Sequence, residues 1–499
     1  MTISGVSGRT SYIGSGILDL RSQLDTLTQQ LASGKISNTY AGQGSGRSLA
    51  IGLRSQLSGL AGYADTALNL NTRINVANLS LQRLVDVGLS VKGAAVSAAG
   101  EIDNTGQTAG QKTASLGFFD SVDMLNAKSG DRYLFSGRAT DTAPVTAADV
   151  IMNGNGAQAG LKQLILERKQ ADVGTSGLGR VVLTAPSVTS VQVAEDASPS
   201  EFGLKLNAIT STLTGATITQ PTGTPAAMSV DLGVTNPADG EQIKFTFNLP
   251  DGTTEDITLT ASSATPLPAN SFAIGATPTA TAANLNAALN TSVGKLANGP
   301  LVAASAVTAG DNFFDQPPMR VGTTPFGAAT TLVAGTTANT VSWYQGESGT
   351  DSARGTAVAQ IDQSIMVQYG ARADEQALRS QLQTVAVFAA VTTSVADPNA
   401  NAQIAALNQR IAQNLADVPG TQSIQDIQAD FAGAGASIKA ATDRQAQTKA
   451  IAQTMLDSIE GINSDEVATK ILALQTSLQA SYQTTSMLYQ TTLTKFLPI

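Results

Sequence analysis

Hydrophobic residues recur at alternating three- and four-residue spacings at both ends of the chain. Near the N-terminus this spacing runs through Leu20, Leu24, Leu27 and Leu31. It places the side chains on one face of a helix and is typical of the seam of a coiled coil or helical bundle. We therefore predict a helix from residue 16 to residue 33.

A longer pattern of the same kind follows a connection rich in Gly and Ser. It predicts a helix from about residue 48 to residue 99, which at 1.5 Å per residue is about 75 Å long. A compact domain does not require a helix of that length. The expected seam comprises Leu53, Leu57, Leu60, Ala64, Ala67, Asn71, Ile74, Asn78, Leu81 and Val85.

The C-terminal part of the chain also reads as helical. We predict helices at residues 371–396, 400–416, 423–462 and 464–495. Ser464 is the expected N-cap of the last helix, since the acidic residues after it suit the start of a helix dipole. The seam expected for that helix comprises Val467, Ile471, Leu474, Leu478, Ser481, Thr485, Leu488 and Thr492.

Between residues 131 and 345 the period changes to two, which is typical of strands. Apolar and polar residues alternate over 243–249 and again over 257–260, and Pro250-Asp251-Gly252 lies between the two runs. This pattern predicts a β-hairpin. We expect further strands at 181–183 and 188–193 and one isolated helix at 281–296.

These patterns predict a mainly α protein with inserted β structure, an α+β fold. Helices from both termini would form a long rod, and the β-rich middle would be carried on it. The expected divisions are an assembly segment at 1–46, the long helix at 47–130, a β-rich segment at 131–215, an inserted β-rich domain at 216–310, a returning β segment at 311–345, helices at 346–463 and a C-terminal assembly helix at 464–499.

Composition excludes several kinds of chemistry. The 499-residue chain contains no His and no Cys, which excludes thiol nucleophiles, His-dependent triads and disulfides. Its formal net charge of −9 argues against an extended nucleic-acid interface. We expect no membrane insertion, because no run approaches the roughly 18 apolar residues of a membrane span. The N-terminal residues also lack the features of a cleaved secretory signal.

Carboxylates are the remaining candidates for acid–base or metal chemistry. Asp311 and Asp315 could bind a hard cation, although no spaced Ca²⁺ loop is present. The densest acidic groups are expected at helix starts or in a hairpin, where solvated acids are common. These groups are Asp374 with Glu375, Asp465 with Glu466, and Asp251 with Glu255 and Asp256. We therefore predict no enzyme activity, no cofactor and no metal site, and a carboxylate hydrolase or a glycan-binding adhesin in the middle region is kept as an alternative.

The loop from Gly42 to Ser48 precedes a helix and could in principle hold a phosphate. It lacks the lysine of a phosphate-binding loop and the spacing of a dinucleotide motif. We interpret it as a connection between two helices. Tyr482 and Tyr489 are expected to pack on one face of the last helix. The apolar end at residues 495–499 is expected to be buried against another subunit.

Three segments resemble the bacterial flagellin family. They are DRYLFSGRATDTAP at 131–144, VQYGARADEQALR at 367–379 and LQTSLQASY at 474–482. Together with the Phe496 to Ile499 ending, they are more similar to the proteins of the hook–filament junction than to filament flagellins. The family's usual acidic, Pro-containing segment after the first helix is replaced here by SNTYAGQGSGR at 37–47.

The resemblance implies a structural subunit of the flagellum that polymerises with itself, other hook-associated proteins and flagellin. It also implies export as an unfolded chain through the flagellar type III pathway to an extracellular position, with a chaperone on the C-terminal helix. A filament flagellin remains the alternative. The residues expected at subunit interfaces are Leu20, Leu24, Leu27, Leu31, Leu474, Leu478, Tyr482 and Leu488.

Overall fold

The computed structural model describes residues 4–97, 101–322 and 324–494, and the side chains of residues 4–11 and 491–494 are not described. About 53% of the chain is helical and 16% is in strands, so the fold is mixed α and β. The chain forms two compact units. The terminal unit comprises Met1–Asn71, Ala359–Val367 and Gly435–Ile499, and the central unit comprises Thr72–Val358 and Gln368–Ala434.

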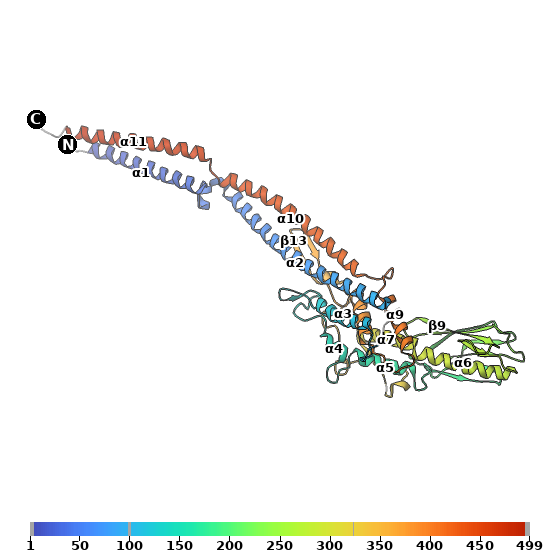
Figure 1. Ribbon diagram of the computed structural model, residues 1–499. Helices are drawn as coiled ribbons and strands as arrows, with labels where there is room; N and C mark the ends of the chain where they lie inside the picture. Colours follow the sequence, from blue (N-terminus) through green and yellow to red (C-terminus); the bar gives the residue numbers. More distant parts are fainter. Residues whose placement is uncertain (1–3, 98–100, 323, 495–499) are drawn as a thin grey trace. The chain divides into compact units, whose positions relative to one another are not determined.

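In the terminal unit the first and last helices lie side by side. Helix α1 (Ser4–Ser33) packs along α11 (Ser464–Thr494), and the two run antiparallel (Figure 1). The least exposed described positions repeat every three or four residues on both helices, as expected for a seam. These positions are Ile13, Ile17, Leu20, Leu24 and Leu27 on α1, and Val467, Ile471, Leu474, Leu478, Ser481 and Thr485 on α11.

Two longer helices follow the same principle. Helix α2 (Arg47–Ser97) and helix α10 (Ile424–Glu460) pack together in the terminal unit through Ala50 and Leu53 against Ala452 and Leu456. A hairpin of β13 (Val358–Asp362) and β14 (Ile365–Gln368) lies against α10. There Gln445 donates a hydrogen bond to the backbone oxygen of Ile361, and Arg444 pairs with Asp362.

The buried stripe on α2 departs from the expected seam after Leu60. The next position in the stripe is Tyr63, so the spacings from Leu57 to Leu60 and from Leu60 to Tyr63 are both three residues. Every second position after Leu60 therefore falls one residue before the expected one. Ala64 and Asn71 are therefore exposed, whereas the expected positions at Ala67, Ile74 and Leu81 are buried. The shift brings into the stripe Tyr63, Leu70, Ala77, Leu84, Val91 and Ala95.

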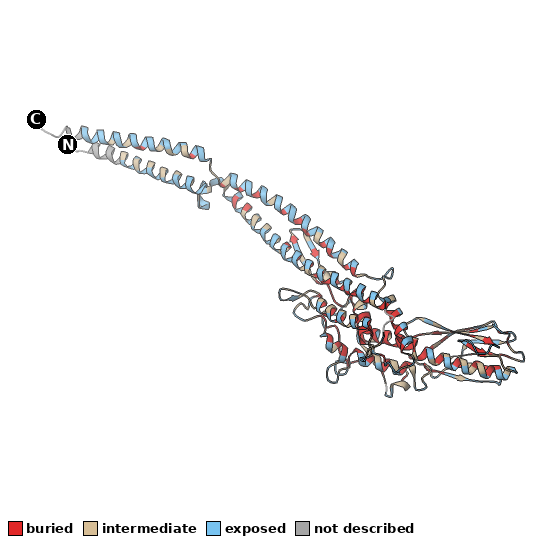
Figure 2. Ribbon diagram, viewed as in Figure 1, coloured by how far each residue is buried: buried red, intermediate tan, exposed pale blue. Residues whose placement is uncertain are grey.

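One part of the central unit is a cluster of helices. Helix α8 (Gln376–Ala390) packs on α3 (Ala109–Leu125) and on α7 (Pro300–Phe314). Helix α7 also contacts α5 (Leu161–Val173) and α9 (Ala400–Asn414). Figure 2 shows buried residues concentrated in these elements, whereas α1 and α11 are mostly exposed. Short elements connect the cluster: α4 (Ala148–Asn153), β1 (Lys128–Ser129), β2 (Arg132–Tyr133), β11 (Met319–Val321) and β12 (Leu332–Ala334), with 3-10 turns at Phe326–Ala328 and Ala353–Thr356.

Eight strands of the central unit form two four-stranded sheets, in the orders β3-β4-β7-β6 and β10-β9-β8-β5, and β1-β2 and β11-β12 form two-stranded sheets. All neighbours are antiparallel except β10 and β9. Helix α6 (Pro278–Asn298) packs on this region, and Phe245, Phe247 and Leu285 lie in its apolar core. The strands are β3 (Val181–Thr184), β4 (Ser190–Glu195), β5 (Lys205–Ser211), β6 (Thr217–Thr222), β7 (Ala227–Asp231), β8 (Gln242–Asn248), β9 (Thr254–Ser262) and β10 (Ser271–Ala273).

The expected hairpin is confirmed, because β8 and β9 pair across the Pro250-Asp251-Gly252 turn. The expected strands at 181–183 and 188–193 correspond to β3 and β4. Residue 216 does not separate two independent groups of strands, however. Strands from before it pair with strands from after it, β4 with β7 and β5 with β8. The segment expected to be β-rich at 131–215 also contains α4 and α5. Helix α6 is not isolated, because α7 begins at Pro300, directly after it.

The ends of some helices also differ from expectation. The first of the C-terminal helices runs only from Gln376 to Ala390. The N-cap of α11 is Asn463 rather than Ser464, because Oδ1 of Asn463 accepts the backbone N–H groups of Asp465 and Glu466. The expected seam position Thr492 and the apolar end at 495–499 lie outside the side chains that the structure describes. No helix among the described residues is long and apolar enough to span a bilayer.

Candidate functional site

The paired helices α1 and α11 hold all eight residues expected at subunit interfaces. Leu20, Leu24, Leu27 and Leu474 are half-buried on the seam, and Leu478 is 6% exposed. These five side chains therefore already lie on an intramolecular contact. The other three remain largely accessible: Leu31 is 41% exposed, Tyr482 47% and Leu488 38%.

On α11, seven residues separate Tyr482 from Tyr489, so these two side chains share one helical face, whereas Leu472 lies roughly 80–100° round the helix from them. Large apolar side chains of α11 that lie outside the seam include Leu472, Tyr482 and Tyr489. They are 63%, 47% and 58% exposed, respectively. On α1, Tyr12 and Leu18 are 81% and 68% exposed. The helix pair thus buries one apolar stripe and leaves large apolar side chains in contact with solvent.

The connection between α1 and α2 lies beside the connection between α10 and α11. The break after α1 contains the 3-10 helix η1 (Tyr40–Gly46), and the break before α11 is only three residues long. The backbone N–H of Ile36 donates to the oxygen of Glu460 at 2.7 Å, and that of Ile462 donates to the oxygen of Gly34 at 3.2 Å. These two bonds tie the breaks to each other.

The buried carboxylate of Glu460 lies at this junction. Its oxygens accept hydrogen bonds from Arg54 at 2.7 Å and from Gln43 at 3.0 Å, and Nζ of Lys35 is 3.6 Å away. Burial opposes ionisation, but these hydrogen bonds and positive charges outweigh it and lower the pKa of Glu460. The Gly-rich loop at 42–48 therefore contributes to a packed connection between helices, through Gln43.

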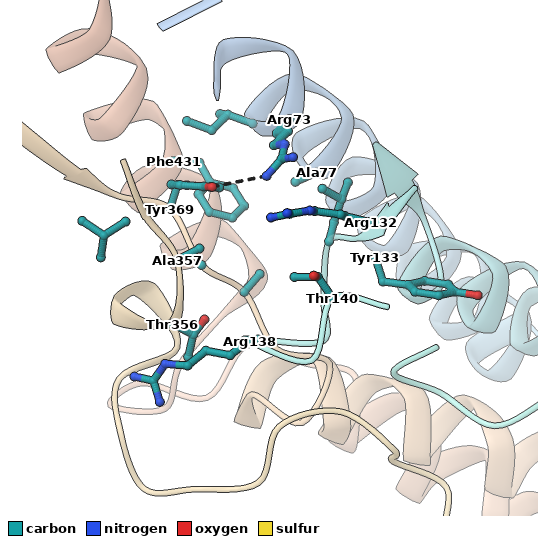
Figure 3. Close-up of a pocket in the computed structure, with 16 residues that line it drawn as sticks. Arg73, Ala77, Arg132, Tyr133, Arg138, Thr140, Thr356, Ala357, Tyr369 and Phe431 are labelled. Atoms are coloured by element: carbon teal, nitrogen blue, oxygen red, sulfur yellow. Dashed lines mark hydrogen bonds between the residues drawn. The ribbon is translucent and has the colours of Figure 1, made fainter. Parts of the chain in front are cut away.

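The central unit contains a cavity of about 290 Å³. Its walls come from α2, from the β2 strand and the loop after it, from the segments on either side of the β13–β14 hairpin, and from Phe431 of α10 (Figure 3). Two of the segments that carry the flagellin resemblance, at 131–144 and 367–379, meet here. Gly137 donates its backbone N–H to the oxygen of Ala371 at 3.0 Å, and Ala373 donates to the oxygen of Phe135 at 2.8 Å.

Three arginines line this cavity: Arg73, Arg132 and Arg138. The guanidinium of Arg138 is paired with Glu347 at 2.7 Å. Arg73 donates to the hydroxyl of Tyr369 at 3.4 Å. These arginines were not predicted from the sequence to be site residues. Arg132 and Arg138 both lie in the segment 131–144, but Arg73 is distant from them along the chain, so only the folded arrangement brings all three together.

The acidic residues considered for catalysis are held in structural contacts. Asp251 is buried and accepts a hydrogen bond from Arg410 at 2.6 Å, and Glu255 lies 3.7 Å from the same guanidinium. Hydrogen bonds from Thr246 and Lys244 lower the pKa of Asp256, so this group is poorly suited to donate a proton.

The other acidic groups are also dispersed. Burial raises the pKa of Asp374, which lies 3.1 Å from Arg372, and the adjacent Glu375 pairs with Arg354. In α11, Asp465 is exposed, and a hydrogen bond from Lys470 lowers the pKa of Glu466.

Burial likewise raises the pKa of Asp311, whose carboxylate accepts a hydrogen bond from Gln383, while Asp315 pairs with Arg379 at 2.6 Å. Within residues 4–97, 101–322 and 324–494, no three acidic side chains are grouped so that they could hold a metal ion.

No protein-family model matches the chain, and no curated protein matches its sequence.

Proposed function

We propose that this protein is a structural subunit of the bacterial flagellum that polymerises through its N- and C-terminal helices. The observation that carries the proposal is the antiparallel pairing of α1 with α11, which leaves Leu472, Tyr482 and Tyr489 exposed outside the seam. An isolated two-helix pair buries little apolar surface, and helices of this kind gain most of their stability from further packing. Contact with the terminal helices of neighbouring subunits would supply that packing.

In the assembled state, the helices from both termini would form one rod, and the β-rich part of the chain would be carried on it. Chain ends that gain most of their stability from other subunits suit a protein that is exported unfolded and polymerises outside the cell. The absence of Cys is compatible with such a route, because no disulfide can form before export. We propose an extracellular position reached through the flagellar type III pathway, with a chaperone that holds α11 before export.

Among the flagellar proteins, the proposal favours the hook–filament junction protein, hook-associated protein 3. The support is the resemblance at residues 131–144 and 474–482. Its partners would then be further copies of the chain, the adjacent hook-associated proteins and flagellin. A filament flagellin has the same kind of terminal helices and is the alternative that the experiment must separate.

Gold-labelled antibodies on intact flagella test the location directly. A junction protein gives label in a short zone at the distal end of the hook, and a strain without the gene keeps its hooks but releases filament protein into the medium. Label along whole filaments would assign the chain to the filament instead. Wild-type flagella that carry no label, together with full-length filaments in a strain that lacks the gene, would contradict a flagellar role.

A further inference from the structure

The cavity in the central unit carries an imbalance of charge. Three arginines and no acidic residue are among the sixteen residues that line it. This is unusual in a chain that has 38 acidic and 29 basic residues. Arg138 is neutralised by Glu347 at 2.7 Å and also lies 3.7 Å from Asp351. The charges of Arg73 and Arg132 are not matched by any carboxylate in the part of the chain that the structure describes.

The side chains of Arg73 and Arg132 converge on one part of the cavity. Arg73 projects from α2 and Arg132 from β2, and Figure 3 shows both guanidinium groups turned toward the side where Tyr369 and Phe431 lie. A guanidinium has five N–H donors, and Arg73 uses one of them in its bond to Tyr369. The side chain of Arg132 makes no hydrogen bond or ion pair with any described residue. The cavity therefore offers many unused donors and two uncompensated positive charges.

The rest of the wall limits what can occupy this space. Ile74, Ala77, Ala357 and Phe431 give it an apolar side. A volume of about 290 Å³ corresponds to about ten water molecules at roughly 30 Å³ each, so it exceeds that of a single inorganic oxyanion. A group with oxygen acceptors on a small, partly apolar body fits both the donors and the apolar wall.

We propose that this cavity binds an oxyanion, a carboxylate or a phosphate, through the guanidinium groups of Arg73 and Arg132. The planar fork of a guanidinium matches two oxygens of such a group, and hydrogen bonds between opposite charges are about twice as strong as neutral ones. The oxyanion is either free in solution or an acidic side chain of a second copy of the chain. Both sources present the same chemistry to the two arginines.

Isothermal titration of the full chain with citrate and with inorganic phosphate, at low ionic strength, tests the free ligand. The double variant Arg73→Gln/Arg132→Gln removes both charges. Arg132→Gln alone removes an exposed side chain that makes no hydrogen bond or ion pair with the described residues, so we expect the variant to fold. Arg83→Gln is the matched control, because Arg83 pairs with Asp120 at 2.6 Å on the surface and does not line the cavity.

We expect citrate or phosphate to bind the wild-type chain and the control equally. Binding should be about tenfold weaker in Arg132→Gln and weaker still in the double variant, since each lost charge-assisted contact costs at least that factor. Equal binding to all four proteins would overturn the proposal. Thermal unfolding of each variant verifies that the chain is folded.

Sedimentation velocity of the same four proteins tests the second source. If neither anion binds, but the double variant loses a self-association that the wild-type chain and the control retain, the ligand is an acidic side chain of another copy. If neither anion binds and association is unchanged, the proposal is wrong. A wild-type chain that never associates contradicts the proposed function alone, because the titration still decides whether the cavity binds an oxyanion.

Discussion

The carboxylate of Asp251 accepts a hydrogen bond from Nε of Arg410 at 2.6 Å, and both side chains are almost completely buried. Asp251 lies in the turn between β8 and β9, whereas Arg410 belongs to α9. Nη2 of Arg410 also donates to the hydroxyl of Thr253 at 3.0 Å. This ion pair therefore connects the β8–β9 turn to α9 in the helical part of the central unit.

We expect Arg410→Ala to lower the free energy of unfolding of the central unit by about 3–5 kcal/mol, because it leaves the carboxylate of Asp251 buried without its partner. Urea denaturation followed by the fluorescence of Trp343 measures the effect. Replacing both residues, in Asp251→Asn/Arg410→Met, should cost less than the single change, since no buried charge is then left unpaired.

Arg379→Ala is the matched control. Arg379 pairs with Asp315 at 2.6 Å, but the side chains are 35% and 59% exposed. A pair in contact with solvent contributes under about 1 kcal/mol. Equal losses from the two single variants would show that burial does not decide the value of these ion pairs.

The second prediction concerns pH and the junction around Glu460. The folded-state pKa of this carboxyl is lowered, so its ionised form stabilises the folded junction at pH values above the pKa of the unfolded chain. That contribution is lost as the pH falls through the lowered pKa. Hydrogen exchange at the amides of Ile36 and Ile462 should therefore be faster near pH 3 than near pH 7, after correction for intrinsic rates.

Glu460→Gln should make the same amides exchange fast at both pH values. The free energy that protects them from exchange should fall by about 1–3 kcal/mol. Glu466→Gln is the control, because Glu466 pairs with Lys470 on the surface and its side chain is 60% exposed. If Glu460→Gln retains the pH dependence of the wild-type chain, another group controls the junction.

The third prediction separates the two faces of α11. Leu478 is 6% exposed and Leu472 is 63% exposed. We expect Leu478→Ala to speed hydrogen exchange throughout α1 and α11 in the monomer, because it removes buried apolar surface from the seam. Leu472→Ala should leave exchange in the monomer unchanged but reduce polymerisation. Normal polymerisation of Leu472→Ala/Tyr482→Ala would show that these two side chains do not contact another subunit.

The fourth prediction concerns removal of the β-rich region. Deleting residues 222–300 should leave an aggregating protein, because the deletion separates β4 and β5 from their partners β7 and β8. Deleting residues 178–298 removes the sheets together. Nδ2 of Asn298 donates to the oxygen of Gly177 at 3.0 Å, so a short Gly-Ser linker can join the ends.

The larger deletion also removes Phe202, which packs against Ala171 of α5, and some stability should be lost with it. Circular dichroism and size-exclusion chromatography compare the two deletions. A monodisperse, cooperatively unfolding protein after the smaller deletion would show that the two sheets are not one folding unit.

The terminal helices and the β8–β9 hairpin were predictable because their apolar residues follow the period of the element. Helix α5 was missed because Glu167, Arg168 and Asp172 are buried in it, so charged residues occupy positions that usually identify the core. Helix α7 was missed for the opposite reason. It is buried on nearly every side and therefore shows no amphipathic period.

The arginine cavity could not be found from the sequence. Arg73 and Arg132 belong to different elements, and Tyr369 approaches them from a distant part of the chain. No spacing rule relates such residues. From the sequence alone, each arginine is expected only to lie at the surface in contact with water. The junction at Glu460 was equally hidden, because its partners Lys35 and Arg54 precede it by more than 400 residues.

The paired interruption at Glu460 also divides the chain ends into a separate cooperative segment. Helices α1 and α11 share their seam with each other, and the two breaks in the helix pair meet at the hydrogen bonds of Ile36 and Ile462. We expect local unfolding to pass along both helices together and to stop where Glu460 pairs with Arg54. One buried carboxylate would then mark the limit between a segment that opens and recloses and the remainder of the helices.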